Sequence, residues 1–126
     1  MDAALLLLFS IRGTPCLSWG TEALVDGGEE PHNRPDLPWD AVDTRTPAIA
    51  MLQDLRTRRR ALSSGDSRVV EASAQGLRVV RRAGDEVAVI DVKQPNSGEW
   101  TPAPLPASIA VDEVVWVASG ASAAEA

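Results

Sequence analysis

The feature that most constrains this chain is an uninterrupted apolar run near its start, from Ala3 to Phe9. The run is too short to span a bilayer. Its continuous apolar character predicts a β-strand covered on both faces, as in a parallel sheet flanked by helices, with a short buried helix as the alternative. The rest of the sequence does not alternate strands and helices, so we expect the partners of such a strand to lie outside it.

An export signal fits this run poorly. Asp2 stands where a signal peptide has a basic residue, and Arg12 interrupts the stretch before a cleavage site. The single cysteine, Cys16, is interpreted as a small buried apolar residue rather than as a nucleophile activated by His32, the single histidine. The compartment stays undecided, with the cytoplasm favoured.

Length and charge exclude several classes of function. The 126 residues amount to one domain or less, well short of the ~250 residues of a β/α barrel. A net charge of −6 argues against nucleic-acid and anionic-membrane partners, although Arg56 to Arg60 form one basic cluster. One cysteine excludes an internal disulfide and a structural zinc cluster. We therefore expect no cofactor, no metal, no nucleic acid and no membrane.

A long loop and a helix follow. Residues 27–38 are rich in Gly, Pro, Asn, Asp and Glu, which predicts an irregular loop of the kind that often carries function; its acidic residues lack the spacing of an EF-hand calcium site. Thr46-Pro47 predicts a helix start, and apolar residues then recur with helical spacing as far as Leu62. Asp54 and Arg58 should pair, and the arginine cluster is interpreted as a helix C-terminus that favours cations.

The remainder predicts a small β-domain. Strands are expected over residues 68–72, 77–82, 86–92 and 114–117, with a hairpin turn at residues 83–85. The third of these is apolar on both faces and should be central. The expected fold is α+β, with a small antiparallel sheet or sandwich packed on one helix.

Three stretches in order resemble one family. Residues 13–22 (GTPCLSWGTE) are similar to the G-T/V-P-x-I/L-Y-Y-G-x-E segment of the α-amylase superfamily, glycoside hydrolase family 13, with Ser18-Trp19 in place of Tyr-Tyr. Residues 30–40 (EPHNRPDLPWD) resemble its D-P-x-N-R-x-x-M-P-W-D loop, found in α-glucosidase-, cyclomaltodextrinase- and trehalose synthase-like members. Residues 52–66 resemble the helix that leads into the family's C-terminal β-sandwich.

The resemblance implies a division of the chain. Residues 1–63 would be the end of the catalytic barrel, with the last strand, the cleft loop and the final helix. Residues 64–119 would be the C-terminal β domain, and residues 120–126 a disordered tail. The fold class is then the C-terminal remnant of a β/α barrel (one strand, loop, helix) followed by a small β domain.

The resemblance also implies where catalysis resides. The family cleaves or transfers α-glucosidic bonds with an aspartate nucleophile, a glutamate acid/base and a second aspartate, all of which precede its final barrel strand. Retaining chemistry needs two carboxyls about 5–5.5 Å apart. No carboxylate of the loop region stands in a matching context: Glu22, Asp26, Glu29, Glu30, Asp36 and Asp40. We expect no catalytic residue in this chain and no activity of the chain alone.

Substrate contact is expected from Asn33 and Arg34, because the loop after a barrel strand rises on the face where active sites lie. Arg34 could instead tie the loop to Asp36 or Asp40. Trp39 could stack on a sugar but is expected to anchor the loop. The implied partners are an α-glucan or maltooligosaccharide, in an intact enzyme only, and a barrel-bearing chain encoded upstream.

Two functions remain open. The first is a C-terminal fragment of an enzyme acting on α-glucans or maltooligosaccharides. The second is a stand-alone accessory β module with a structural or carbohydrate-binding role. A self-sufficient module has no reason to carry a first strand that is apolar on both faces, so the fragment is favoured.

Overall fold

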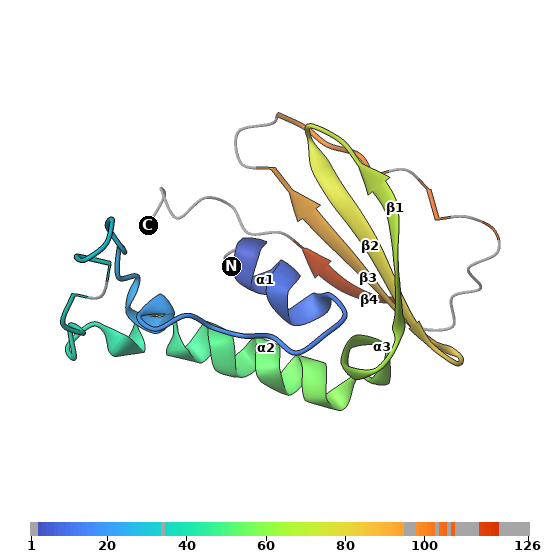
Figure 1. Ribbon diagram of the computed structural model, residues 1–126. Helices are drawn as coiled ribbons and strands as arrows, with labels where there is room; N and C mark the ends of the chain where they lie inside the picture. The colour runs from blue at the N-terminus through green and yellow to red at the C-terminus, as the bar shows by residue number, and fades with distance from the viewer. Residues whose placement is uncertain are drawn as a thin grey trace.

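A computed structural model describes residues 3–33, 35–94, 98–102, 104–105, 107 and 114–118. A four-stranded sheet forms one layer, and helices α1 (Ala3–Ser10), α2 (Thr46–Arg58) and α3 (Arg60–Ser63) form the other (Figure 1). The segment between α1 and α2 contains two short 3-10 helices, η1 (Thr21–Ala23) and η2 (Val42–Thr44). Among the described residues, no helix combines the length and apolar character needed to cross a membrane.

The sheet has the order β1-β2-β3-β4. Its strands are β1 (Asp66–Ala72), β2 (Gly76–Ala83), β3 (Glu86–Lys93) and β4 (Val114–Ala118). The first three pair antiparallel, and a register shift interrupts β1 between Val69 and Glu71. The four predicted strands and the central place of β3 are thus confirmed. The prediction of a wholly antiparallel sheet is wrong at its last strand, because β4 pairs parallel to β3.

The turn between β2 and β3 shows why this hairpin forms. Ala83 pairs with Glu86, which leaves a two-residue loop at Gly84 and Asp85. Gly84 has a φ of 67°, in the left-handed region that two-residue hairpin loops require and that glycine adopts without strain. The Gly-Asp pair therefore fixes the register of the two central strands.

The apolar run at the start is a helix, and the predicted strand is wrong. Ala3–Ser10 forms α1, an eight-residue helix that is apolar on every side. Ala and Leu are among the best helix formers, and a helix satisfies its own backbone hydrogen bonds, whereas a strand needs neighbours. The alternative of a short buried helix is the correct one.

Helix α1 packs on its own chain. Leu5, Leu6 and Phe9 are buried in a cluster between the helices and the sheet, and Leu6 has no exposed surface. At ~1.5–3 kcal/mol per large apolar side chain, this burial contributes roughly 5–9 kcal/mol, an upper value because unfolded chains are partly compact. The cluster continues through residues of α2, α3 and the helix-facing side of the sheet, including Leu52, Leu62, Val79 and Ile90.

The other face of the sheet carries a second, smaller cluster. Val80, Val87 and Val89 are buried there, and Leu105 packs against them. Nearby, the Trp100 indole covers Gly76 and donates from Nε1 to Glu71 Oε1 at 2.9 Å. Trp100 and Leu105, which follow β3 in the chain, therefore cover part of this face.

The predicted helix at Thr46 is confirmed, with differences at both ends. Arg45 is the N-cap, Pro47 lies in the first turn, and Thr46 Oγ1 donates to the Val42 carbonyl at 2.7 Å instead of capping the helix. At the other end Arg59 is extended, with φ −112° and ψ 111°, and α3 follows as one separate turn. The extended residue turns the chain toward β1.

Candidate functional site

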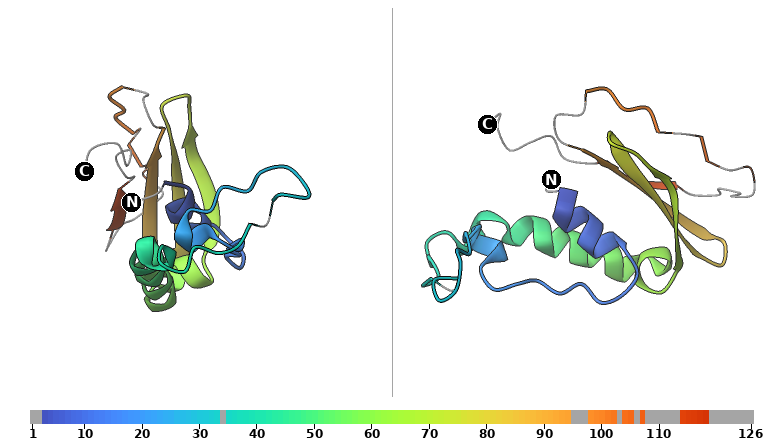
Figure 2. Two further views of the ribbon diagram at one scale, coloured as in Figure 1. Left: turned by 90° about the vertical axis from the view of Figure 1, so that its left-hand side faces the viewer. Right: turned by 45° about the horizontal axis from the view of Figure 1, so that its top comes forward.

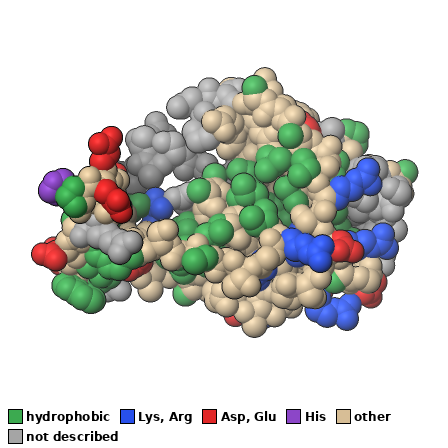
Figure 3. Space-filling view, viewed as in Figure 1, with side chains coloured by type: hydrophobic (Ala, Val, Ile, Leu, Met, Phe, Trp, Pro, Cys, Tyr) green, Lys and Arg blue, Asp and Glu red, His purple; other side chains and the backbone are tan. Residues whose placement is uncertain are grey.

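The loop that the sequence singles out projects from the end of the molecule. Residues 24–41, the projecting loop, extend beyond the first turn of α2 and away from the sheet (Figures 1 and 2). A backbone hydrogen bond from Arg45 N to Glu22 O, 3.1 Å long, closes its base. Acidic side chains gather at this end of the molecule (Figure 3). The loop is thus fixed by a hydrogen bond at its base and extends away from the sheet.

Within the projecting loop, the chain folds back on itself through a turn. His32 N donates to Glu29 O at 2.7 Å across the cis Glu30-Pro31 peptide. Asn33, one of the two predicted sugar contacts, follows this turn and is half-buried. Arg34, the other, lies outside the described residues. The predicted contact of these two residues with sugar therefore stays a prediction.

Two further predictions for this region are wrong. Trp39 does not anchor the loop, because 78% of the residue is exposed. Cys16 is exposed rather than buried. Both lie in segments without helix or strand, where no second layer of the protein covers the chain. Trp39 thus presents its indole to solvent, as a residue that stacks on a sugar ring must.

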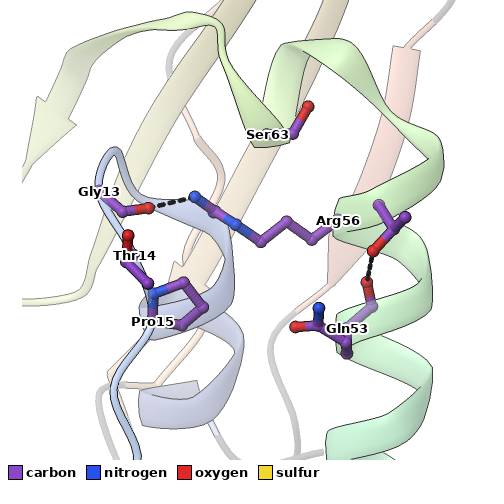
Figure 4. Close-up of a pocket in the computed structure, with 7 residues that line it drawn as sticks. Gly13, Thr14, Pro15, Gln53, Arg56 and Ser63 are labelled. Carbon is purple, nitrogen blue, oxygen red and sulfur yellow. Dashed lines mark hydrogen bonds between the residues drawn. The ribbon is translucent and has the colours of Figure 1, made fainter.

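A pocket of about 500 Å³ lies at the opposite end of α2. It is lined by residues 13–15, Gln53, Arg56, Thr57 and Ser63. Figure 4 shows the Gln53 amide on the side of α2 that faces Pro15, and the Arg56 side chain reaching across to Gly13. The pocket therefore joins the segment after α1 to the last two turns of α2 and to α3.

Arg56 is the charged group of this pocket. It is only 7% exposed. Nη1 donates to the carbonyls of Phe9 at 2.7 Å and Ile11 at 3.0 Å, and Nη2 donates to that of Gly13. The Phe9 carbonyl belongs to the last turn of α1, and the Ile11 and Gly13 carbonyls follow that turn, so the guanidinium caps this end of the helix.

The arginine cluster lies at the C-terminal end of α2, as predicted, but the burial of Arg56 was not predicted. Its sequence position held a signal, because it lies four residues after Leu52, the buried residue of the apolar face. Arg58 fits the interpretation, since it is exposed and pairs with Asp54 as predicted.

A second buried arginine caps the same helix. Arg81 has no exposed surface; Nη1 donates to Ser10 O at 2.5 Å and Nη2 to Gly65 O at 2.7 Å, while Nε has no partner among the described residues. Burial lowers the pKa of Arg81, and the nearby charge of Arg56 lowers it further. Alternation along β2 could have found it, because Val79 and Arg81 share the face toward the helices.

On the other face of the sheet, Arg78 and Asp91 form a buried pair across β2 and β3. Two hydrogen bonds of 2.7 Å and 2.6 Å join the guanidinium to the two carboxylate oxygens. The hydrogen bonds that Arg78 donates to the Asp91 carboxylate raise the pKa of Arg78. Both groups are cross-strand neighbours in register, which makes the pair a structural one.

Carboxylates do not gather into a site in the part of the chain that the structure describes. No three side chains of the types His, Cys, Asp and Glu lie close enough there to hold a metal ion. Glu86, for example, stabilises a helix end, because its Oε1 accepts a hydrogen bond of 3.1 Å from Ala61 N at the start of α3.

Known proteins similar to this chain are glycoside hydrolases. A cyclomaltodextrin glucanotransferase from Niallia circulans is 30% identical over 97 residues, covering 75% of this chain and 13% of that enzyme. A cyclomaltodextrinase from a Bacillus species is 29% identical over 99 residues, covering 76% of this chain and 18% of that enzyme. No protein-family model matches the chain.

Solved structures agree with these relatives. The ligand-free cyclic α-maltosyl-(1→6)-maltose hydrolase from Arthrobacter globiformis matches with a TM-score of 0.66 and 29% identity, covering 74% of this chain and 22% of that one. The same enzyme in complex with cyclic α-maltosyl-(1→6)-maltose matches equally.

These matches define a class: glycoside hydrolases and transferases of the α-amylase superfamily. The chain belongs to that superfamily, glycoside hydrolase family 13, and the resemblance of its three motifs is confirmed. It spans between 13% and 18% of the length of the curated relatives named here. The α+β fold with a small β domain is confirmed as well.

Proposed function

We propose that this chain is a C-terminal part of an α-amylase-family enzyme that acts on α-glucans or maltooligosaccharides. The observation that carries the proposal is the ordered succession of three family motifs, at residues 13–22, 30–40 and 52–66, within one stretch of similarity to enzymes named for cyclic maltooligosaccharides. In this proposal residues 1–63 are the end of the catalytic barrel, residues 64–119 are the C-terminal β domain and residues 120–126 are a tail.

The proposed role of the projecting loop is to contact sugar. Asn33 and Arg34 supply an amide and a guanidinium, which donate hydrogen bonds to hydroxyl groups. Trp39, exposed beyond them, supplies an aromatic face. The catalytic carboxylates belong, in this proposal, to barrel sequence outside these 126 residues, on the same polypeptide or on a separate chain.

The first test is an activity assay. The 126-residue chain alone should release no sugar from maltooligosaccharides or aryl α-glucosides, because a retaining mechanism needs two carboxyls held across the scissile bond. Turnover by the pure chain, abolished by mutating one of its own carboxylates, would overturn the proposal.

The second test uses the chain together with a barrel-bearing partner sequence. Arg34→Ala should lower kcat/KM by about tenfold, the loss expected for a charge-assisted hydrogen bond to a sugar hydroxyl. The matched control is Arg60→Ala, which removes an exposed arginine paired with Asp85 and should leave kcat/KM unchanged. Equal effects of the two substitutions on kcat/KM would show that Arg34 does not contact the substrate.

One observation favours a second candidate, the stand-alone accessory module. The apolar first element, expected to need partners from elsewhere, buries Leu6 and Phe9 against the sheet of the same chain. The isolated chain should then be a monomer that unfolds in one cooperative transition. Aggregation, or loss of α1 before the sheet on heating, would favour the enzyme fragment.

A further inference from the structure

The pocket at the C-terminal end of α2 has a composition that nothing in the proposed catalytic role explains. Its volume of about 500 Å³ falls within the range of pockets that bind small ligands. Its α2 residues lie in the C-terminal half of that helix, whereas the projecting loop precedes the N-terminal end. Its walls carry an amide, a guanidinium and three hydroxyls, and no carboxylate.

Several of these polar groups have hydrogen-bond donors or acceptors that no described residue uses. Arg56 uses three of its five N–H donors on the carbonyls after α1, which leaves Nε–H and one Nη2–H without an acceptor among the described residues. The Thr14 hydroxyl and the Gln53 amide make no hydrogen bond within that part of the chain. The Thr57 hydroxyl donates to Gln53 O at 2.8 Å and so still has lone pairs that can accept.

The charge of the pocket is compensated before any ligand arrives. The Arg56 guanidinium faces carbonyls at the C-terminal end of α1, where the helix dipole is negative, and it lies in the last turn of α2, where the dipole is negative too. Neighbouring cations also have partners. Arg12, Arg58 and Arg60 pair with Asp66, Asp54 and Asp85, and Arg81 donates to the carbonyls of Ser10 and Gly65. An anion therefore gains little here.

One wall is apolar. The Pro15 ring lines the pocket opposite the Gln53 amide, as Figure 4 shows. A ligand that fits must present an apolar face to this ring and hydroxyl groups, which both donate and accept, to the remaining walls. A pyranose ring has this pattern, with C–H groups on its faces and hydroxyls around its edge.

We propose that this pocket is a binding site for a neutral saccharide, separate from the projecting loop. Gln53 and Thr14 hydrogen bond to sugar hydroxyls, Arg56 donates with its remaining N–H groups, and Pro15 packs against the ring. Every residue that lines the pocket belongs to the 126-residue chain, so the site can be tested on this chain whichever of the two functions is correct.

The test is a titration of the 15N-labelled 126-residue chain with maltose, followed by NMR. The Gln53 side-chain amide, the Thr14 backbone amide and the Arg56 Nε–H signal should shift together and saturate. Sodium sulfate, titrated in parallel at the same ionic strength, should shift them less and without saturation. A preference for sulfate over maltose would overturn the proposal, because it would show an anion site.

Two variants locate the binding. Gln53→Ala and Thr14→Ala should each weaken maltose binding about fivefold, the effect of losing one hydrogen bond between neutral groups. Arg56 is left intact because its loss would also release three carbonyls. The matched controls are Met51→Ala, which removes an exposed side chain from another face of the same helix, and Thr101→Ala, both of which should bind as the parent chain does.

The remaining outcomes count against the site. If maltose shifts only signals of residues 32–39, the saccharide binds to the projecting loop and the pocket proposal is wrong while the proposed function stands. If maltose gives no saturable shift anywhere, the pocket does not bind a neutral saccharide and the proposal is wrong. If the controls lose affinity as much as Gln53→Ala does, the binding is not in this pocket.

Discussion

The packed body, made of α1–α3 with β1–β3, differs from the projecting loop in which side chains are buried and which are exposed. The body buries arginines, and Arg56, Arg78 and Arg81 each hold partners in another element. The loop exposes large apolar side chains, with 52% of Leu24 and 78% of Trp39 in contact with solvent. Buried groups with partners are explained by folding, whereas exposed aromatic groups are free to bind.

The largest expected effect is in the core of the packed body. Leu6→Ala should lower the free energy of unfolding by about 3 kcal/mol, because a fully buried leucine leaves a cavity. Urea denaturation followed by circular dichroism measures it. The matched variant in the projecting loop, Leu24→Ala, should cost under about 0.5 kcal/mol. Similar costs for the two would mean that α1 is not packed on the sheet.

The next effect concerns the arginine cap of α1. Arg81→Met should lower the free energy of unfolding by about 2 kcal/mol, because the Ser10 and Gly65 carbonyls lose their donors in the interior. Relief of the burial that lowers the Arg81 pKa offsets part of this cost. Arg58→Met, an exposed counterpart, should cost under about 0.5 kcal/mol. An Arg81→Met chain as stable as the parent would show that desolvation cancels the cap.

A smaller effect is expected on the other face of the sheet. A Cβ at Gly76 would lie 2.7 Å from ring atoms of Trp100, so Gly76→Ala must displace the indole at a cost of about 1–2 kcal/mol. Tryptophan fluorescence should change with stability. Gly28→Ala, whose Cβ would meet only His32 O at 3.7 Å, serves as the control and should change neither.

The smallest effect on the free energy of unfolding is expected in the projecting loop. Trp39→Ala should change the free energy of unfolding by under about 0.5 kcal/mol, because the indole is mostly exposed. Thermal unfolding of the two chains checks this. If Trp39→Ala lowers the free energy of unfolding about as much as Leu6→Ala does, Trp39 anchors the loop, and the loop unfolds together with the packed body.

Local signals were enough to predict most of the regular structure. The spacing from Thr46 onward predicts α2, and alternation with a Gly-Asp turn predicts the β2–β3 hairpin, because each pattern depends on neighbours in the chain. The apolar run of α1 is ambiguous in principle, since periodicity cannot separate a buried strand from a buried helix. Its leucines and alanines, rather than β-branched residues, were the signal for the helix.

The candidate sites were less predictable. The motif of residues 30–40 marks the projecting loop, but exposure of Trp39 follows from the absence of a covering layer, which one sequence does not reveal. The pocket combines residues 13–15 with Gln53, Arg56, Thr57 and Ser63, which only the fold brings together. Arg56 was assigned to the helix C-terminus together with the other arginines, although its position four residues after Leu52 placed it on the buried face.

The cap of α1 has a consequence for synthesis of the chain. Ser10 meets Arg81 across 71 residues, and Phe9 meets Arg56 across 47. An eight-residue helix is only marginally stable on its own. We therefore expect α1 to become stable only after the residues that pack on it have been synthesised. At 5–20 residues per second the delay before Arg81 is made is about 4–14 s. During this delay the apolar octapeptide lacks the residues that bury and cap it in the folded chain.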